Sequence, residues 1–237
     1  MPAVRRRLLL FDIDGTLLHT GGAGISAIYE GIQGAFDLGE AADQMPPLNL
    51  AGATDAGLAR FLFGHFQIDH SPENEEAFYD AYHKSLSQNL AHHSETNNGR
   101  LLPGITELLE RLSQYDHLAL GLLTGNIQRG AWTKLKQFEI GHFFHTGAFG
   151  DDHHDRNHLG PIAITRATEH FEWDFTAEDT VIIGDTPKDI ACARACGACA
   201  IAVATGTFAF ETLATFQPDH LFENFEDDSS FLKAIGV

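Results

Sequence analysis

Basic residues are scarce in this chain. Its 237 residues include 15 lysines and arginines against 33 aspartates and glutamates, a formal charge of −18. A surface with that balance repels nucleic acid, and no basic stripe offsets it, so we expect no nucleic-acid partner. An anionic small substrate is repelled too, unless its site holds a metal ion or a few well-placed cationic groups.

Long apolar runs and cysteines are also scarce. No apolar stretch approaches the roughly 18 residues that a membrane span needs, so we expect no membrane association. The three arginines before a short apolar run resemble a signal peptide, but the run turns acidic at Asp12. The three cysteines, Cys192, Cys196 and Cys199, offer no second pair for a zinc or disulfide framework, and their odd number is typical of a reducing compartment. We therefore expect a cytoplasmic protein.

The most informative segment is Asp12-Ile13-Asp14-Gly15-Thr16-Leu17, which follows the apolar run 8–11. The run predicts a buried parallel strand, and such a strand delivers its last side chains to the carboxyl edge of a sheet, where open α/β folds bind their ligands. Asp12 and Asp14 would repel each other there unless a cation or a shared proton compensates. The simpler interpretation is a strand that ends in a polar Asp-Gly turn.

Two parts of the chain have different patterns. From about residue 21 to residue 93 we expect helices and no strand, at about 25–36, 54–64 and after the Ser71-Pro72-Glu73 helix start. From Leu101 onward helices and strands alternate, with strands expected at about 118–123, 144–149, 181–183, 198–203 and 220–222.

Alternating strands and helices predict an α/β fold, a doubly wound parallel sheet with helices on both faces. We expect residues 1–19 and 96–237 to form this core domain. Residues 20–95 would form a small α-helical cap domain inserted after the first strand. The polar segment 94–100 reads as the return linker, and the glycine-rich stretch 20–24 as a hinge or a simple turn.

Further strand ends carry polar residues. Thr124-Gly125-Asn126 follows one strand and is suited to hold a phosphate, although it is also an ordinary helix N-cap. Asp185 and Asp189 follow another strand, one helical turn apart, as hard oxygen ligands suited to Mg²⁺ or as an acidic helix start that the helix dipole favours. Arg156, among acids after a third strand, is a candidate cation or a solvated surface charge.

Two other groups have ordinary interpretations that we favour. Thr54 and Asp55 in the helical part could face the core, but a helix N-cap pair needs no such role. Five of the 14 histidines are close in sequence, yet their spacings favour solvated side chains over a zinc site; they are His142, His145, His153, His154 and His158.

Together these motifs resemble the haloacid dehalogenase (HAD) superfamily, in particular its phosphoglycolate phosphatase-like branch with an inserted helical cap. The resemblance covers nearly the whole chain, with segments 12–17 and 184–189 in the expected order and Thr124 at the strand-end Ser/Thr position. It implies a Rossmann-like core, a Mg²⁺ cofactor and a small phosphorylated metabolite as substrate. The departure is Arg156, where the family usually has lysine; His153, His154 and Lys188 are lesser candidates for that cation.

The resemblance also implies roles for these residues. Asp12 attacks the phosphorus to form an aspartyl-phosphate, while Asp14 protonates the leaving oxygen and then activates water. The metal lies between Asp12, the backbone carbonyl of Asp14, and Asp185, with Asp189 binding it directly or through water. Substrate binding and transition-state stabilisation are assigned to a further set: Thr124, Gly125, Asn126 and Arg156.

Other activities share part of this pattern. A phosphomutase of the β-phosphoglucomutase type has the same core motifs, whereas a dehalogenase has no need of Asp14. A phosphonate hydrolase needs a cap lysine, and Lys84 is the only one in the expected cap. A non-catalytic receiver module also gathers acids around a phosphorylatable aspartate but lacks an inserted cap. A monomer or a homodimer is expected.

Overall fold

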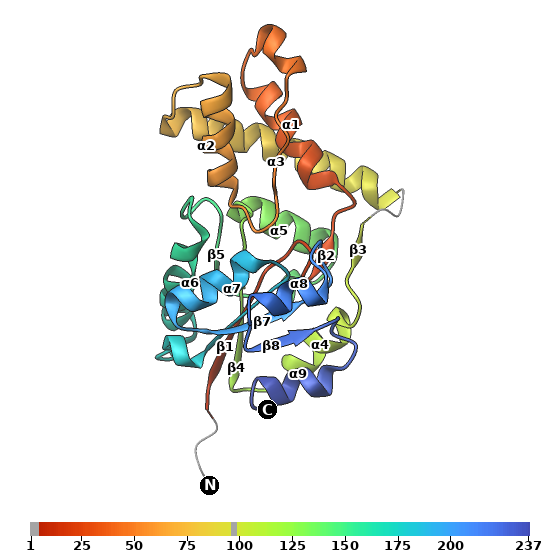
Figure 1. Cartoon of the computed structure of the whole chain (residues 1–237), viewed down its shortest axis with the longest axis vertical. Helices are drawn as coiled ribbons and strands as arrows, with labels where there is room; N and C mark the ends of the chain where they lie inside the picture. Colours follow the sequence, from red (N-terminus) through yellow and green to blue (C-terminus); the bar gives the residue numbers. More distant parts are fainter. Residues whose placement is uncertain (1–4, 96–98) are drawn as a thin grey trace.

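The computed structural model describes residues 5–95 and 99–237. Six parallel strands form one sheet in the order β5-β4-β1-β6-β7-β8, at the centre of the α/β layers in Figure 1. The strands are β1 (Arg7–Phe11), β4 (Leu118–Leu123), β5 (Gly147–Ala148), β6 (Thr180–Gly184), β7 (Cys199–Val203) and β8 (His220–Phe222). This is the doubly wound fold that the sequence predicts.

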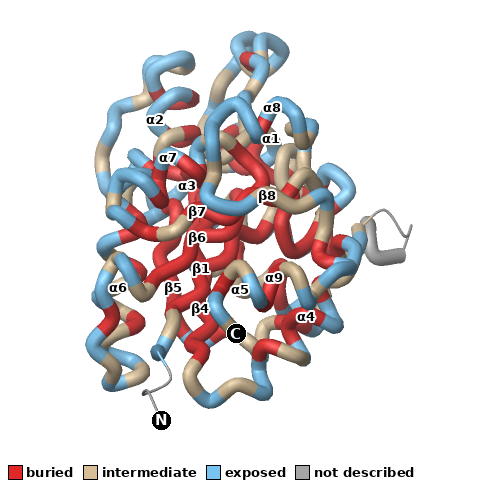
Figure 2. Tube along the Cα trace, turned by 60° about the horizontal axis from the view of Figure 1, so that its bottom comes forward, coloured by how far each residue is buried: buried red, intermediate tan, exposed pale blue. Residues whose placement is uncertain are grey.

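Strand β1 shows why the sheet is covered on both faces. Its side chains alternate between two separate hydrophobic clusters, with Leu9 and Phe11 in one and Leu8 and Leu10 in the other. The first cluster is covered by α4 (Ile105–Leu112), α5 (Gln128–Gln137) and α9 (Asp228–Ala234). The second is covered by α6 (Leu159–Phe171), α7 (Pro187–Cys196) and α8 (Phe210–Thr215). A strand buried on both sides reads as a continuous apolar run, and Figure 2 shows this buried centre.

Three helices lie beyond the sheet at one end of the molecule: α1 (Ala23–Ala35), α2 (Asp55–Phe66) and α3 (Pro72–Glu95) (Figure 1). They have a hydrophobic cluster of their own, and a Cβ at Gly31 would lie 2.8 Å from the Tyr82 Cα, so α1 and α3 pack closely because that residue is glycine. The cap boundaries at residues 20 and 95 remain a prediction. Residues 96–98 of the expected return linker lie outside the described residues.

Some elements differ from the expectations. The strand expected at 144–149 is only Gly147–Ala148, because only these two residues pair with β4 at the edge of the sheet. Two short segments that the sequence did not indicate, β2 (Leu18–His19) and β3 (Arg100–Leu101), pair antiparallel where the chain leaves and re-enters the core. Strands of two residues carry no periodic signal, so only the pairing reveals them.

The topology places the candidate residues at one edge. Strand β1 pairs with β4 on one side and β6 on the other, with Phe11 opposite both Leu122 and Ile183. The strand order reverses around β1, and ligands of open α/β sheets bind outside the carboxyl ends at such a point. Among the helices of the described residues, none has the length together with the hydropathy of a membrane-crossing segment.

Candidate active site

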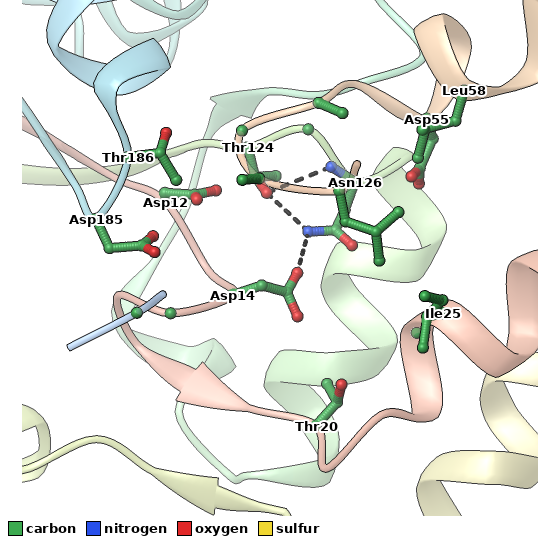
Figure 3. Close-up of a pocket in the computed structure, with 18 of the residues that line it drawn as sticks. Asp12, Asp14, Thr20, Ile25, Asp55, Leu58, Thr124, Asn126, Asp185 and Thr186 are labelled. Atoms are coloured by element: carbon green, nitrogen blue, oxygen red, sulfur yellow. Dashed lines mark hydrogen bonds between the residues drawn. The ribbon is translucent and has the colours of Figure 1, made fainter. Parts of the chain in front are cut away.

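Asp12 is fixed at the end of β1. Its backbone N–H donates a hydrogen bond to the Ile183 carbonyl at 2.9 Å, and the residue is buried. The chain then turns at Gly15, whose φ is +85° and whose Cβ, if present, would lie 2.4 Å from Asp185 Oδ2. Only glycine fits this turn, which packs against Asp185 just after β6, at the cavity drawn in Figure 3.

Asp185 and Asp189 are positioned by the start of α7. Thr186 is the N-cap and Pro187 the first helical residue, a capping box in which Asp189 Oδ2 accepts from the Thr186 amide at 3.0 Å and from its hydroxyl at 2.7 Å. The Thr16 hydroxyl donates to Asp185 Oδ1 at 3.2 Å. The acidic helix start is therefore a capping box. Asp189 caps the helix with Oδ2 and presents Oδ1 to the site.

Three carboxylates converge here. Oxygens of Asp12, Asp185 and Asp189 all lie within 4.8 Å of one another, and all three residues are buried. Burial raises the pKa of Asp12 to about 6, against the opposing field of Arg156, and burial with the neighbouring Asp189 and Asp12 raises the pKa of Asp185 well above its usual range. Their negative charge is therefore incompletely compensated by the protein, which fits a bound divalent cation with oxygen ligands.

Arg156 supplies the cation at this cluster. It begins a short 3₁₀ turn (Arg156–His158), is 5% exposed, and its Nη2 lies 3.3 Å from Asp12 Oδ1 and 2.5 Å from Asp189 Oδ1. Among the described buried side-chain polar atoms, its Nε alone has no hydrogen-bond partner. Lys188 instead lines a neighbouring cavity with Gly52 and Thr54, and it is not part of the lining of the cavity in Figure 3.

The end of β4 adds a second polar group. Asn126 Nδ2 donates to Asp14 Oδ2 at 2.7 Å and to the Thr124 hydroxyl at 2.8 Å (Figure 3). Lys134, on α5, is 2% exposed, and its ammonium donates to Asp14 Oδ2 at 2.6 Å and to Asn126 Oδ1 at 2.5 Å. Asp14 is thus held from two sides, while its side chain remains 41% exposed.

Lys134 did not emerge from the sequence analysis. It lies eight residues after Asn126, and on a helix its surroundings read as an exposed amphipathic face. One signal existed: Asn126, Gly130 and Lys134 are spaced four apart, so a small residue separates two polar ones along one face. That pattern leaves room for a long side chain to run back along the helix.

The helical cap meets the core at the first turn of α2. The Asp55 amide donates to the Gly125 carbonyl at 2.7 Å, and Asp55 Oδ2 accepts from the Ile127 amide at 2.8 Å. Thr54 is the N-cap, accepting from Gly57 N at 3.1 Å, and its hydroxyl also donates to the His154 carbonyl at 2.6 Å. The pair that the sequence favoured as a plain cap therefore also joins cap to core.

A cavity of about 390 Å³ lies between cap and core. Figure 3 shows Asp12, Thr124 and Asp185 toward one end and Ile25, Leu58 and Asp55 toward the other, with Asp14 between them. The lining also includes Arg156, Ile28 and Lys134. This volume is within the usual range for small-molecule sites.

Comparison with known proteins identifies the family. A model of the haloacid dehalogenase-like hydrolases matches residues 9–203, the span from β1 through β7. The chain belongs to this family.

Similar proteins agree in fold along nearly their full length. A phosphoglycolate phosphatase of Photorhabdus laumondii is 24% identical, over 98% of this chain and 93% of that protein. The structure of a hydrolase from Pseudomonas syringae has a TM-score of 0.67 at 18% identity, covering 98% of this chain and 100% of the other. A candidate β-phosphoglucomutase from Bacteroides vulgatus has a TM-score of 0.64 at 18% identity, covering 99% and 90%.

The histidines do not form a second centre. His153 stacks between His154 and His158, at ring-centroid distances of 4.5 and 4.1 Å. Among the side chains that the structure describes, Asp12, Asp185 and Asp189 are the one group of three or more histidine, cysteine or acidic residues with ligand atoms close enough to share a metal ion.

The burial of Asp55 between cap and core can be tested through the pH dependence of folding stability. Burial raises its pKa to about 7, against the Ile127 amide and Lys134, whereas an unfolded aspartate titrates near 3.9. As the pH rises from about 4 to about 7, the unfolded chain ionises Asp55 before the folded chain does, so folding stability falls. Asp55→Asn keeps the acceptor oxygen, and we expect it to stabilise the fold at pH 8 by roughly 2–4 kcal/mol.

The measurement is urea unfolding at pH 5 and pH 8, with EDTA present. The advantage of Asp55→Asn should shrink at pH 5, and the exposed Asp116→Asn is the matched control. A difference from the wild type that is the same at both pH values would contradict this account of Asp55.

Proposed function

We propose that this protein is a Mg²⁺-dependent phosphatase that hydrolyses small-molecule phosphomonoesters through an aspartyl-phosphate on Asp12. The observation that carries the proposal is the pairing of two acids in different surroundings at one strand end. Asp12 is buried against Arg156, whereas Asp14 is held by Lys134 and Asn126 and faces the cavity. Family membership and the phosphatase names of its relatives support the same activity.

Asp12 and Asp14 divide the chemistry. A carboxylate oxygen of Asp12 forms a bond to phosphorus as the ester P–O bond breaks, and Asp14 gives its proton to the departing alkoxide. Asp14 then takes a proton from water, which attacks the phosphorus and releases phosphate from Asp12. The exposed carboxyl of Asp14 can reach both the leaving group and water, whereas Asp12 lines the cavity but is buried against Arg156.

The acidic cluster would hold the metal. Asp12, Asp185 and the backbone carbonyl of Asp14 are the proposed ligands, and Mg²⁺ bound there supplies positive charge that offsets the phosphate. Asp189 takes part through water in this scheme, because its two oxygens already accept from Thr186 and Arg156.

The β4 end and Arg156 would bind the transferring phosphoryl group. The Thr124 hydroxyl and the amides of Gly125 and Asn126 follow a strand tip, where N–H groups can face an anion. The Asn126 amide also donates a long hydrogen bond to Thr124 Oγ1 at 3.4 Å. Arg156 is anchored to Asp189 and to the Leu123 carbonyl, so its position is set before the substrate arrives. A fixed guanidinium stabilises developing charge without reorganisation.

Phosphate release separates this proposal from a phosphomutase, which transfers the phosphoryl group to another hydroxyl of a sugar phosphate. The likeness to the Bacteroides vulgatus structure concerns the fold. The helices at 23–95 and the hydrolase family membership argue against the receiver-module alternative.

The activity itself is the first prediction. Purified protein with Mg²⁺ should release inorganic phosphate from p-nitrophenyl phosphate, and EDTA should abolish turnover, because the uncompensated carboxylates repel the substrate without a cation. Asp12→Asn should retain the fold and lose essentially all activity. Undiminished turnover in the metal-free protein or in Asp12→Asn would overturn the proposed function.

The cation at Asp12 gives the second prediction. Arg156→Ala should lower kcat with p-nitrophenyl phosphate by roughly two orders of magnitude, as with other lost electrostatic donors. Arg156→Lys should recover part of it, since a point charge replaces a planar fork. The matched control is Lys188→Ala, which removes a cation one helical position from Asp189 but outside the cavity lining. If Arg156→Ala keeps nearly full activity while Lys188→Ala loses most of it, the cation that acts on the phosphoryl group is Lys188 and not Arg156.

Lys134 is proposed as a positioning residue for Asp14. Lys134→Met removes the ammonium while keeping the length of the side chain, and the half-exposed Asp14 stays solvated. Loss of aligned leaving-group protonation should lower kcat/KM by about a hundredfold for an alkyl phosphate. For p-nitrophenyl phosphate, whose leaving group needs little protonation, the loss should be below about tenfold.

The value of kcat/KM is used because it reports formation of the phosphoenzyme, before the hydrolysis step that all substrates share. Asp14→Asn should show the same selectivity for the better leaving group. Equal losses on both substrates in Lys134→Met would show that Lys134 does not act through Asp14.

A further inference from the structure

The part of the cavity that receives the leaving group lies beyond Asp14, against the helical cap. Ile25 and Ile28 of α1 and Leu58 of α2 line it, with Tyr82 of α3 and Asp55 (Figure 3). Since the phosphate end is fixed by Asp12, Thr124 and Arg156, whatever is esterified to the phosphate must extend toward these residues. Their chemistry therefore selects the substrate.

The lysine and arginine side chains in the described lining of this cavity are already paired with carboxylates. Among the described lining residues the lysines and arginines are Lys134 and Arg156. Arg156 is buried between Asp12 and Asp189, and Lys134 lies against Asp14 and Asn126. No lysine or arginine of the described lining is left to pair with a negative charge on the leaving group.

Negative charge dominates the same region. Asp14 and Asp55 both line it, and a carboxylate added to the substrate would have to lose water beside them without gaining a cation. Burial raises the pKa of Asp55 to about 7, so negative charge is disfavoured at this position even on the protein's own carboxyl group.

The remaining wall is apolar. Ile28 and Leu58 are buried, and Ile25 and Leu50 are half-buried on the same wall. Covering such side chains with a hydrocarbon portion of the substrate is favourable, whereas covering them with a hydrated carboxylate is not. The Tyr82 hydroxyl and the Asp55 carboxyl are hydrogen-bonded to each other, and Asp55 also accepts from the Ile127 amide.

We infer that the natural leaving group is an uncharged alcohol with an apolar portion, and that the site discriminates against phosphoesters that carry a carboxylate, 2-phosphoglycolate included. This inference rests on the proposed phosphatase function and narrows its substrate class. This substrate class differs from phosphoglycolate, the substrate that the names of these relatives give. Their sequence identity to this chain is 22–25%. Specificity here comes from an unpaired charge in the rejected substrate.

The test compares three esters of similar size: 2-phosphoglycolate, its uncharged amide and n-propyl phosphate. All rates are measured at pH 8 with Mg²⁺ present. We expect kcat/KM for the amide and for propyl phosphate to exceed that for 2-phosphoglycolate by about tenfold or more. A wild-type preference for 2-phosphoglycolate would overturn the inference.

A charge swap in the cap isolates the cause. Ile25→Lys places an ammonium on the leaving-group wall, and Ile25→Met is the neutral control of similar length. The ratio of kcat/KM for 2-phosphoglycolate to that for its amide should rise about tenfold in Ile25→Lys and stay within about twofold in Ile25→Met. Because each ester has the same intrinsic reactivity with every variant, the change in ratio reports the pocket alone. An unchanged ratio in Ile25→Lys would contradict the electrostatic argument.

Failure of this inference and failure of the proposed function look different. If p-nitrophenyl phosphate is hydrolysed and 2-phosphoglycolate is preferred over its amide, the substrate class is wrong and the phosphatase function stands. If none of the four esters is hydrolysed with Mg²⁺ present, the proposed function fails, and the inference fails with it.

Discussion

The ion pairs of Arg156 are the interaction on which the rest of the site depends. Three buried carboxylates lie at one sheet edge, and a single guanidinium contacts two of them, Asp12 and Asp189. Buried charges are tolerated only when they are paired and hydrogen-bonded. The capping box of α7 and the glycine turn after Asp14 serve the same need, because each supplies donors or space around a carboxylate. One cation against three acids leaves a deficit, which is the physical reason to expect a metal ion.

A second polar group separates the roles of the two acids. Lys134 and Asn126 fix Asp14 without burying it, and they do so from α5 rather than from the loop that carries Arg156. The cap closes the other side through hydrogen bonds of the Thr54 hydroxyl and of the Asp55 carboxylate and amide to backbone groups of the core. Removing Lys134 and removing Arg156 should therefore impair different steps, protonation of the leaving group and stabilisation of the phosphoryl group.

Much of the fold and site could be predicted because its signals are local. An apolar run that ends in acids marks a strand tip, and parallel strands bring such tips together, so Asp12, Thr124 and Asp185 could be placed near one another from spacing alone. Arg156 was a weaker prediction, since one arginine among surface acids has no local signal of burial. Lys134 was missed and Asp55 was undervalued, because the importance of each arises from contacts between elements far apart in the sequence.

The sequence by itself determined the strand tips, the acidic helix start at Asp185 and Asp189 and the order of the elements, because backbone geometry and apolar periodicity act over a few residues. Tertiary structure alone decided which cation faces Asp12, that a helix lysine reaches Asp14, and that Asp55 is buried where the cap docks on Gly125. Those outcomes depend on how far a side chain is removed from water and on what meets it there. Such quantities are set by packing between distant segments and have no counterpart in local sequence.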